Sequence, residues 1–97
     1  MSILGVGIQQ PEEILDYDIF YDDWINIAID QLTSVAINIL PANSTLNVSA
    51  QLSGPDTVKL WVQGGNDGDE YTIEVTVTTT AGRVKQDELL ITIQDFV

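Results

Sequence analysis

Residues 60–75 read LWVQGGNDGDEYTIEV, and this stretch decides the fold. On both sides of its glycine-rich centre, apolar residues occupy every second position, which is the pattern of a half-buried β-strand. Gly68 stands three residues before Tyr71, where a glycine permits a sharp corner between two sheets. A tyrosine there can hydrogen-bond through its hydroxyl back across the corner, as in the tyrosine corner of Greek-key sandwiches. We therefore assign Gly68 and Tyr71 a structural role.

The same alternation extends along the chain on both sides of this stretch. Apolar residues recur at every second position in segments 17–21, 25–29, 35–39, 46–50, 58–62, 71–77 and 89–93. Turn-forming residues lie between most of these segments, at 41–43, 53–56, 64–68 and 81–82. About seven short strands in 97 residues indicate one all-β domain, either a sandwich or a small barrel. Of these two we expect a Greek-key β-sandwich.

Residues 12–30 are the one segment that also fits a helix. Pro11 suits the first turn of a helix, and Glu12 and Glu13 favour its positive N-terminal end. However, Tyr17, Ile19 and Tyr21 alternate with Asp16, Asp18 and Asp22. We therefore expect a strand, with the three aspartates on one face and the apolar residues on the other.

The charge balance excludes several kinds of partner. The chain has 15 acidic against 3 basic residues, a net charge of −12, which repels nucleic acid and anionic lipid. No stretch approaches the roughly 18 apolar residues of a membrane span, and residues 1–10 carry no secretory signal. We expect a cytosolic protein that binds neither nucleic acid nor membrane.

Residue types and chain length also argue against catalysis. Without Cys or His, thiolate, zinc, haem and histidine-dependent chemistry is unavailable. Residues 66–69, with the aspartates at 22 and 23 as a second source of carboxylates, lack the full spacing of a calcium loop. A domain this small has little room for both a core and a substrate cleft. We expect no enzyme, no cofactor and no metal site.

Two tryptophans invite a binding interpretation. An exposed indole is a good platform for a sugar or a peptide. Trp61 lies between Leu60 and Val62, and the alternation alone leaves open which set is buried. We favour a core position for Trp61 and leave the position of Trp24 open.

The first ten residues carry no charge, and Leu4, Val6 and Ile8 alternate there with glycines. Such an arm would be an exposed apolar edge strand, so something must cover it. Either it completes its own sandwich or it adds a strand to a neighbouring subunit. We favour the neighbour, which divides the chain into an arm (1–10) and a sandwich domain (11–97). The candidate docking residues are Leu4, Val6, Ile8, Asp16, Asp18, Asp22, Asp23 and Trp24.

Several motifs occur in an order that resembles a known family. They are Leu15-Asp16-Tyr17, Asp23-Trp24, residues 36–41, residues 60–71 and TTTAGR at 78–83. In this order they are similar to the phage fiber-tail adaptor proteins, small virion proteins with an immunoglobulin-like fold. Val62-Gln63 stands where the family has Leu-Ser, and aliphatic Ile37 and Ile39 stand where a tryptophan is often found. These departures leave the fold intact and the partner open.

The resemblance implies a non-catalytic virion structural protein that links a tail or neck component to a fiber or other appendage. Its partners would be other virion proteins, contacted in multiple copies and assembled in the host cytoplasm. Two alternatives stay open. One is a head-decoration or neck protein, and the other is a carbohydrate-binding module that uses Trp24 or Trp61.

Overall fold

The computed structural model describes residues 2–26, 28–40 and 45–94. They form seven strands: β1 (Ser2–Gln9), β2 (Ile14–Phe20), β3 (Leu32–Leu40), β4 (Leu46–Leu52), β5 (Thr57–Gly64), β6 (Glu70–Thr79) and β7 (Val84–Ile93). No helix occurs among these residues, and so none could cross a membrane. The predicted all-β fold is confirmed, and residues 14–20 are a strand as expected.

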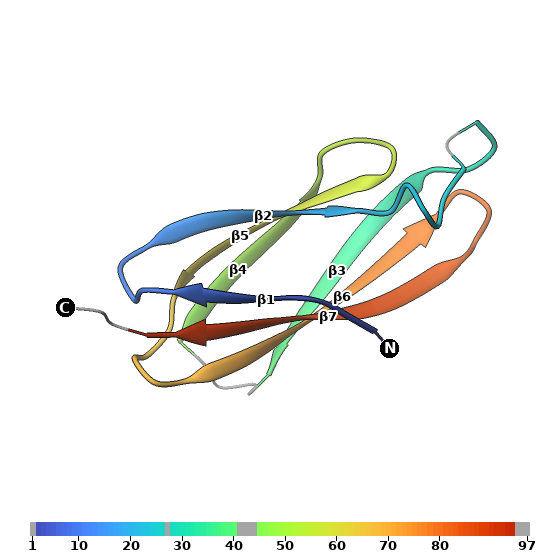
Figure 1. The fold of residues 1–97 in the computed structure, drawn as a ribbon. Coiled ribbons are helices and arrows are strands. Elements are labelled where there is room, and N and C mark those ends of the chain that lie inside the picture. The colour runs from blue at the N-terminus through green and yellow to red at the C-terminus, as the bar shows by residue number, and fades with distance from the viewer. Residues whose placement is uncertain (1, 27, 41–44, 95–97) are drawn as a thin grey trace.

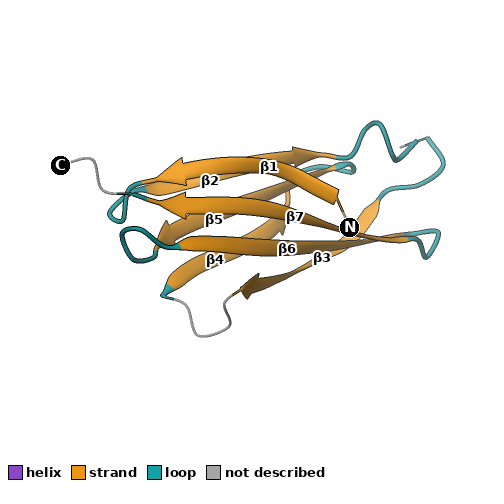
Figure 2. Cartoon of the chain, turned by 60° about the horizontal axis from the view of Figure 1, so that its bottom comes forward, coloured by secondary structure: helices purple, strands orange, loops and turns teal. Residues whose placement is uncertain are grey.

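The strands form two layers, as Figures 1 and 2 show. One sheet has the order β1-β7-β6-β3 and the other the order β2-β5-β4. All neighbours are antiparallel except β1, which runs parallel to β7. β2, β5 and β4 correspond to strands B, E and D of an immunoglobulin domain, and β3, β6 and β7 to strands C, F and G. The molecule is elongated, about 48 Å in its longest dimension.

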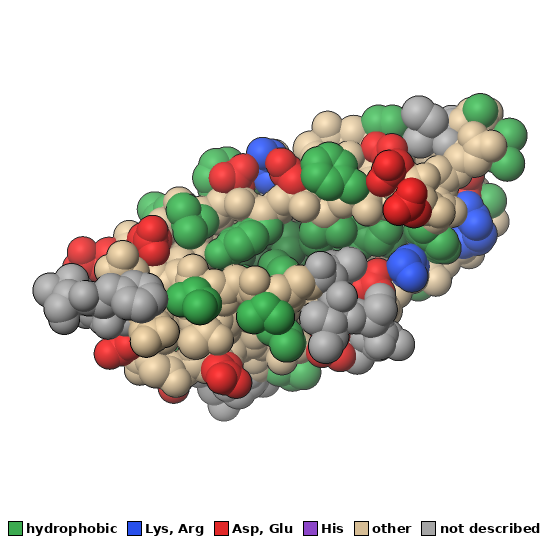
Figure 3. All heavy atoms as spheres, viewed as in Figure 1, with side chains coloured by type: hydrophobic (Ala, Val, Ile, Leu, Met, Phe, Trp, Pro, Cys, Tyr) green, Lys and Arg blue, Asp and Glu red, His purple; other side chains and the backbone are tan. Residues whose placement is uncertain are grey.

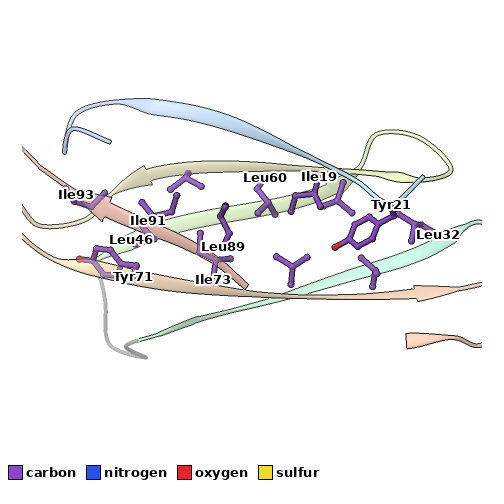
Figure 4. Close-up of a cluster of buried hydrophobic side chains, with 14 of the residues drawn as sticks. Ile19, Tyr21, Leu32, Leu46, Leu60, Tyr71, Ile73, Leu89, Ile91 and Ile93 are labelled. Atoms are coloured by element: carbon purple, nitrogen blue, oxygen red, sulfur yellow. The ribbon is translucent and has the colours of Figure 1, made fainter. Parts of the chain in front are cut away.

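The core lies between the two sheets and is built from the inward-facing residues of each strand (Figure 4). Those with no exposed surface are Val58, Leu60, Val62, Ile73, Val75, Val77, Ile91 and Ile93. They come from the three strands with the most regular alternation, because the side-chain period of a strand matches the period of the sequence. Branched aliphatic side chains dominate this core, and they pack well on a pleated surface.

The predicted tyrosine corner is present between β5 and β6. The backbone N–H of Asn66 donates a hydrogen bond to the Tyr71 hydroxyl at 3.1 Å. Gly68 has a φ of +86°, and a Cβ there would meet nothing within 4 Å. Gly65 also has a positive φ, but a Cβ there would lie 2.7 Å from Cγ1 of Ile93. Gly64 is restricted in the same way, because its φ is +82° and a Cβ there would lie 2.9 Å from the backbone oxygen of Thr45. Backbone conformation and close packing therefore both restrict Gly64 and Gly65 to glycine.

The strand expected at residues 25–29 is absent, and this prediction was wrong. The backbone carbonyl of Tyr21 accepts hydrogen bonds from the N–H groups of Trp24 and Ile25, and that of Asn26 accepts them from Ile29 and Asp30. These bonds fold the described residues of segment 21–31 into turns, and we call this segment the distal loop. Ile27 lies outside the described residues. Alternating isoleucines mimicked a strand, while local turns satisfied the backbone.

Residues 2–9 complete the sandwich of their own chain instead of reaching a neighbour. β1 pairs with β7, and the predicted boundary between residues 10 and 11 falls within a turn of the sandwich. The inward positions of β1 are Gly5, Gly7 and Gln9, while Val6 and Ile8 face outward. The predicted number of strands was therefore right, but one strand was predicted in the wrong place. β1 replaces the strand expected at 25–29.

Gln9 fastens β1 across the open edge between the two sheets. Its side chain is fully buried, and its amide nitrogen donates to the carbonyls of Glu13, at 2.9 Å, and Val62, at 2.8 Å. Its amide oxygen accepts a hydrogen bond of 3.0 Å from the Tyr17 hydroxyl. Buried polar groups that are fully hydrogen-bonded specify one packing arrangement. Gln9 thereby fixes the register of β1 against both sheets.

Candidate docking surfaces

The outer face of the four-stranded sheet carries exposed apolar side chains at one end. Val6 is opposite Leu90, Leu90 is opposite Thr72, and Thr72 is opposite Leu40, so this row crosses all four strands. Val6 and Ile8 are 69% and 58% exposed. We call Val6, Ile8, Leu40 and Leu90 the outer apolar patch. Of the predicted docking residues, the patch contains Val6 and Ile8, and the side chain of Leu4 lies outside the described residues.

The distal loop lies at the other end of the molecule, beside the turn between β6 and β7 (Figure 1). It is anchored by Asp30, which is buried although it is charged. Asp30 accepts hydrogen bonds from the Thr80 hydroxyl at 2.6 Å and the Ala81 backbone at 3.0 Å. Arg83 donates to its other oxygen through Nε at 3.2 Å and Nη2 at 3.0 Å. These donors, the Thr80 hydroxyl first, hold the pKa of the Asp30 carboxyl well below its usual range.

Trp24 belongs to the same anchor and is not an exposed platform. Its ring is half-buried and meets the ring of Tyr21 edge-on, with 6.1 Å between centroids. The guanidinium of Arg83 lies 5.0 Å from the Trp24 centroid, and the ammonium of Lys85 lies 5.7 Å from it. Cations over an indole are attracted by the ring quadrupole. Trp24, Asp30 and Arg83 thus form one cluster that shapes the distal loop.

The predicted face of three aspartates is only partly correct. Asp16 and Asp18 lie on the outer side of β2, but β2 ends at Phe20 and Asp22 belongs to the distal loop. The ammonium of Lys59 on β5 bonds Asp16 at 2.9 Å and lies 3.4 Å from Asp18. Its hydrogen bond is the main cause that lowers the pKa of Asp16. Asp22 and Asp23 are exposed, and within the described chain they form no ion pair.

The interpretation of Trp61 as a core residue was wrong. Leu60 and Val62 are fully buried, so Trp61 faces outward on the three-stranded sheet and is 41% exposed. It borders a shallow pocket whose other lining residues are Ile14, Asn47, Val48, Ser49 and Gln63. All of these side chains are uncharged, and the nearby ammonium of Lys59 lies 5.8 Å from the centroid of the Trp61 ring.

Charge is distributed unevenly over the rest of the surface. Each of the three basic residues forms an ion pair: Lys59 with Asp16 and Asp18, Arg83 with Asp30, and Lys85 with Asp87. Acidic side chains occur along the whole length of the face seen in Figure 3. The two carboxylate sources considered for calcium, residues 66–69 and the aspartates at 22 and 23, lie at opposite ends of the sandwich. The described residues hold no cluster of three or more potential metal ligands.

Sequence reasoning missed several residues of these surfaces. Gln9 and Asp30 are polar residues in apolar runs, and their roles depend on partners far away in sequence. Arg83 stood in a quoted motif, which was the one available signal. Phe20, which is 67% exposed, was assigned no role, and Ile29, which is 81% exposed, was expected to belong to a strand.

Comparisons with known proteins agree with this geometry. The model of a family described as "Podophage GP4 fiber-tail adaptor protein gp77" matches residues 9–92. No curated protein matches the sequence at a significant level. Among solved structures, the crystal structure of the titin M3 domain is similar, with 19% identity and a TM-score of 0.53. The match covers 94% of this chain and 92% of that one, and it shows a common immunoglobulin-like fold.

Proposed function

The chain belongs to the podophage fiber-tail adaptor family, and from that premise we propose that it is a non-catalytic virion protein joining a tail or neck component to a fiber. An adaptor must hold two partners at once, so it needs two separate contact surfaces. The observation that carries the proposal is that the outer apolar patch and the distal loop lie at opposite ends of a molecule about 48 Å long.

The outer apolar patch suits a permanent contact. Exposed apolar side chains on neighbouring strands mark surfaces that another protein covers. Here Val6, Ile8 and Leu40 are exposed around half-buried Leu90, on a flat sheet that offers little to a small ligand. We assign this patch to the partner that is held more tightly.

The distal loop suits a partner with a basic surface. Asp22, Asp23 and Ile29 are exposed on it, and the Asp30 cluster holds the loop in place. Such rim charges mainly set the rate of encounter and its dependence on salt. Neutralising both (Asp22→Asn, Asp23→Asn) should therefore slow association at low salt, as measured by surface plasmon resonance. If the salt dependence stays unchanged, the loop is not the charged contact.

The adaptor role is tested on virions produced with variant protein. Val6→Asp with Ile8→Asp puts two charges into the outer apolar patch and should abolish incorporation, as measured by quantitative mass spectrometry of purified particles. Ala36→Asp with Gln86→Asp is the matched control, because it adds the same charge to exposed positions elsewhere on the same face. If both variants are incorporated normally, the patch does not join the chain to the particle.

A head-decoration or neck role would place the same surfaces against different partners. Labelled particles imaged by cryo-electron microscopy separate these locations, and we expect the label between tail and fiber. A label on the capsid shell would replace the adaptor role with a decoration role.

A second candidate function is favoured by the uncharged pocket beside Trp61. A neutral oligosaccharide has apolar C–H faces that stack on an indole and hydroxyls that bond amide side chains. Among the described residues, the side chains of Asn47, Ser49 and Gln63 have no internal hydrogen-bond partner and are free for this purpose. Titration calorimetry with neutral hexasaccharides tests the candidate, with Trp61→Ala as the variant that should lose binding. If no heat of binding is detected at millimolar sugar, the carbohydrate-binding function is excluded.

A further inference from the structure

The two sheets are not closed on the side where β1 faces β2. At one end of this side, Gln9 and the Tyr17 hydroxyl bridge the gap, as described above. Beyond that bridge the gap opens into a groove, because the inward position of β1 is Gly5, which has no side chain to fill it. A hydrophobic band is visible between the two layers in Figure 3.

The groove has an apolar floor and an apolar rim. Its floor is formed by Tyr17, Ile19 and Leu89, of which the last two are core residues. Val6 on β1 forms one rim of the groove, and Phe20 at the end of β2 forms the other. Phe20 is 67% exposed, and exposing so large a ring is costly unless a partner covers it.

One wall of the groove is the open edge of β2. Within the described chain β2 pairs only with β5, so its other edge presents backbone N–H and C=O groups that no strand satisfies. Natural proteins usually cover or protect such an edge, because it is a template for pairing with another strand. Here the edge lies directly beside an apolar groove, which is the combination that recognises an extended peptide.

We propose that this groove is an acceptor for an extended segment of a partner protein, which pairs with β2 and inserts alternate apolar side chains above Ile19 and Leu89. Asp16 and Asp18 also line the groove, and their side chains are about 40% exposed despite the contact with Lys59. The segment therefore carries lysine or arginine at positions between its apolar residues. The proposal rests on the adaptor role and extends it by a third surface, which shares only Val6 with the outer apolar patch.

A second copy of the chain is the less suitable occupant. Each copy has a net charge of −12, and two such chains repel each other where Asp16 and Asp18 lie on both sides of a contact. A basic partner segment gains from the same charges, since electrostatic complementarity favours encounter and selects the partner.

Gly5→Val gives a sharp test. A Cβ at Gly5 would be in ordinary contact with Leu89, 3.7 Å from its Cδ1, and the backbone of Gly5 is not in the left-handed region. The variant should therefore fold, while its side chain occupies the groove. Ser49→Val is the matched control, because it adds an exposed branched side chain to the outer face of β4.

The probe is a synthetic ten-residue peptide of alternating valine and lysine, with a valine and glutamate peptide as the charge control. We expect the lysine peptide to bind the full chain and to protect the β2 amides (Ile14–Phe20) from hydrogen exchange. Gly5→Val should weaken binding at least about tenfold, and Ser49→Val should leave it unchanged. Absence of binding at millimolar peptide, equal binding of both peptides, or equal binding by Gly5→Val overturns the proposal.

Two further measurements separate this groove from the other surfaces. If sedimentation shows a dimer that Gly5→Val abolishes, the occupant is a second copy and the proposed partner segment is wrong. In virions, Gly5→Val should lower the content of one other tail or fiber protein while the chain itself is still incorporated. Normal content of every virion protein overturns the groove proposal and leaves the adaptor role to the test on the outer apolar patch.

Discussion

The two ends of the sandwich are held together by different kinds of interaction. At the corner end, between β5 and β6, the Tyr71 hydroxyl and glycines with positive φ fix the turn. At the distal end, the buried carboxylate of Asp30 accepts hydrogen bonds from the β6–β7 turn and from Arg83. The first end depends mainly on backbone shape and on the Tyr71 hydroxyl, which also donates a long hydrogen bond of 3.4 Å to Asp69. The second depends on one buried, ionised carboxylate. The distal loop, which we propose as a contact surface, is thus supported by an anchor that acid can weaken.

The largest difference should appear between two glycines with the same backbone conformation. Gly65→Ala at the corner end combines a left-handed backbone with a Cβ 2.7 Å from Cγ1 of Ile93, and should cost about 3 kcal/mol. Gly82→Ala at the distal end has a φ of +85° but open space around it, and should cost about 1 kcal/mol. Urea unfolding measures both. Equal costs would mean that packing against Ile93 adds nothing to the strain of the backbone.

The next effect is the loss of stability in acid at the distal end. The pKa of Asp30 is lowered in the folded chain, so the unfolded chain binds a proton first as the pH falls below about 4. The free energy of unfolding should therefore be intact at neutral pH and decrease as the pH falls from about 4 towards the lowered pKa. Melting temperatures between pH 2.5 and 6 measure this decrease.

Asp30→Asn should flatten that acid dependence, because the side chain no longer titrates, and should lower stability at neutral pH by leaving Arg83 without its ion pair. Glu70→Gln is the control, since it removes one exposed carboxylate at the corner end. A control that flattens the curve as much as Asp30→Asn would assign the acid loss to overall charge.

The smallest effect should come from the corner hydroxyl. Tyr71→Phe keeps the buried ring and removes the hydrogen bond from the Asn66 N–H, which should cost about 1 kcal/mol. The melting temperature should fall by about 4–8 °C for a domain of this size. A change below 1 °C would mean that the glycines alone hold the corner.

The sequence by itself determined the features that depend on neighbouring residues. Strands β2 to β7 follow from alternation, because a side chain on a strand faces the opposite side from its neighbour whatever lies across from it. The tyrosine corner follows from Gly68 and Tyr71 for the same reason, since both groups lie within one turn.

Tertiary structure alone decided which side of each strand is buried and which distant residues meet. Trp61 and Leu60 alternate in the same way, and only the position of the second sheet makes Leu60 core and Trp61 surface. Asp30 and Arg83 are 53 positions apart, so no local sequence pattern predicts their ion pair. The pair forms only when β3, β6 and β7 assemble. β1 likewise pairs with β7 of its own sandwich, and the buried side chain of Gln9 there bonds the carbonyl of Val62, 53 positions away, a contact that only the folded sandwich provides.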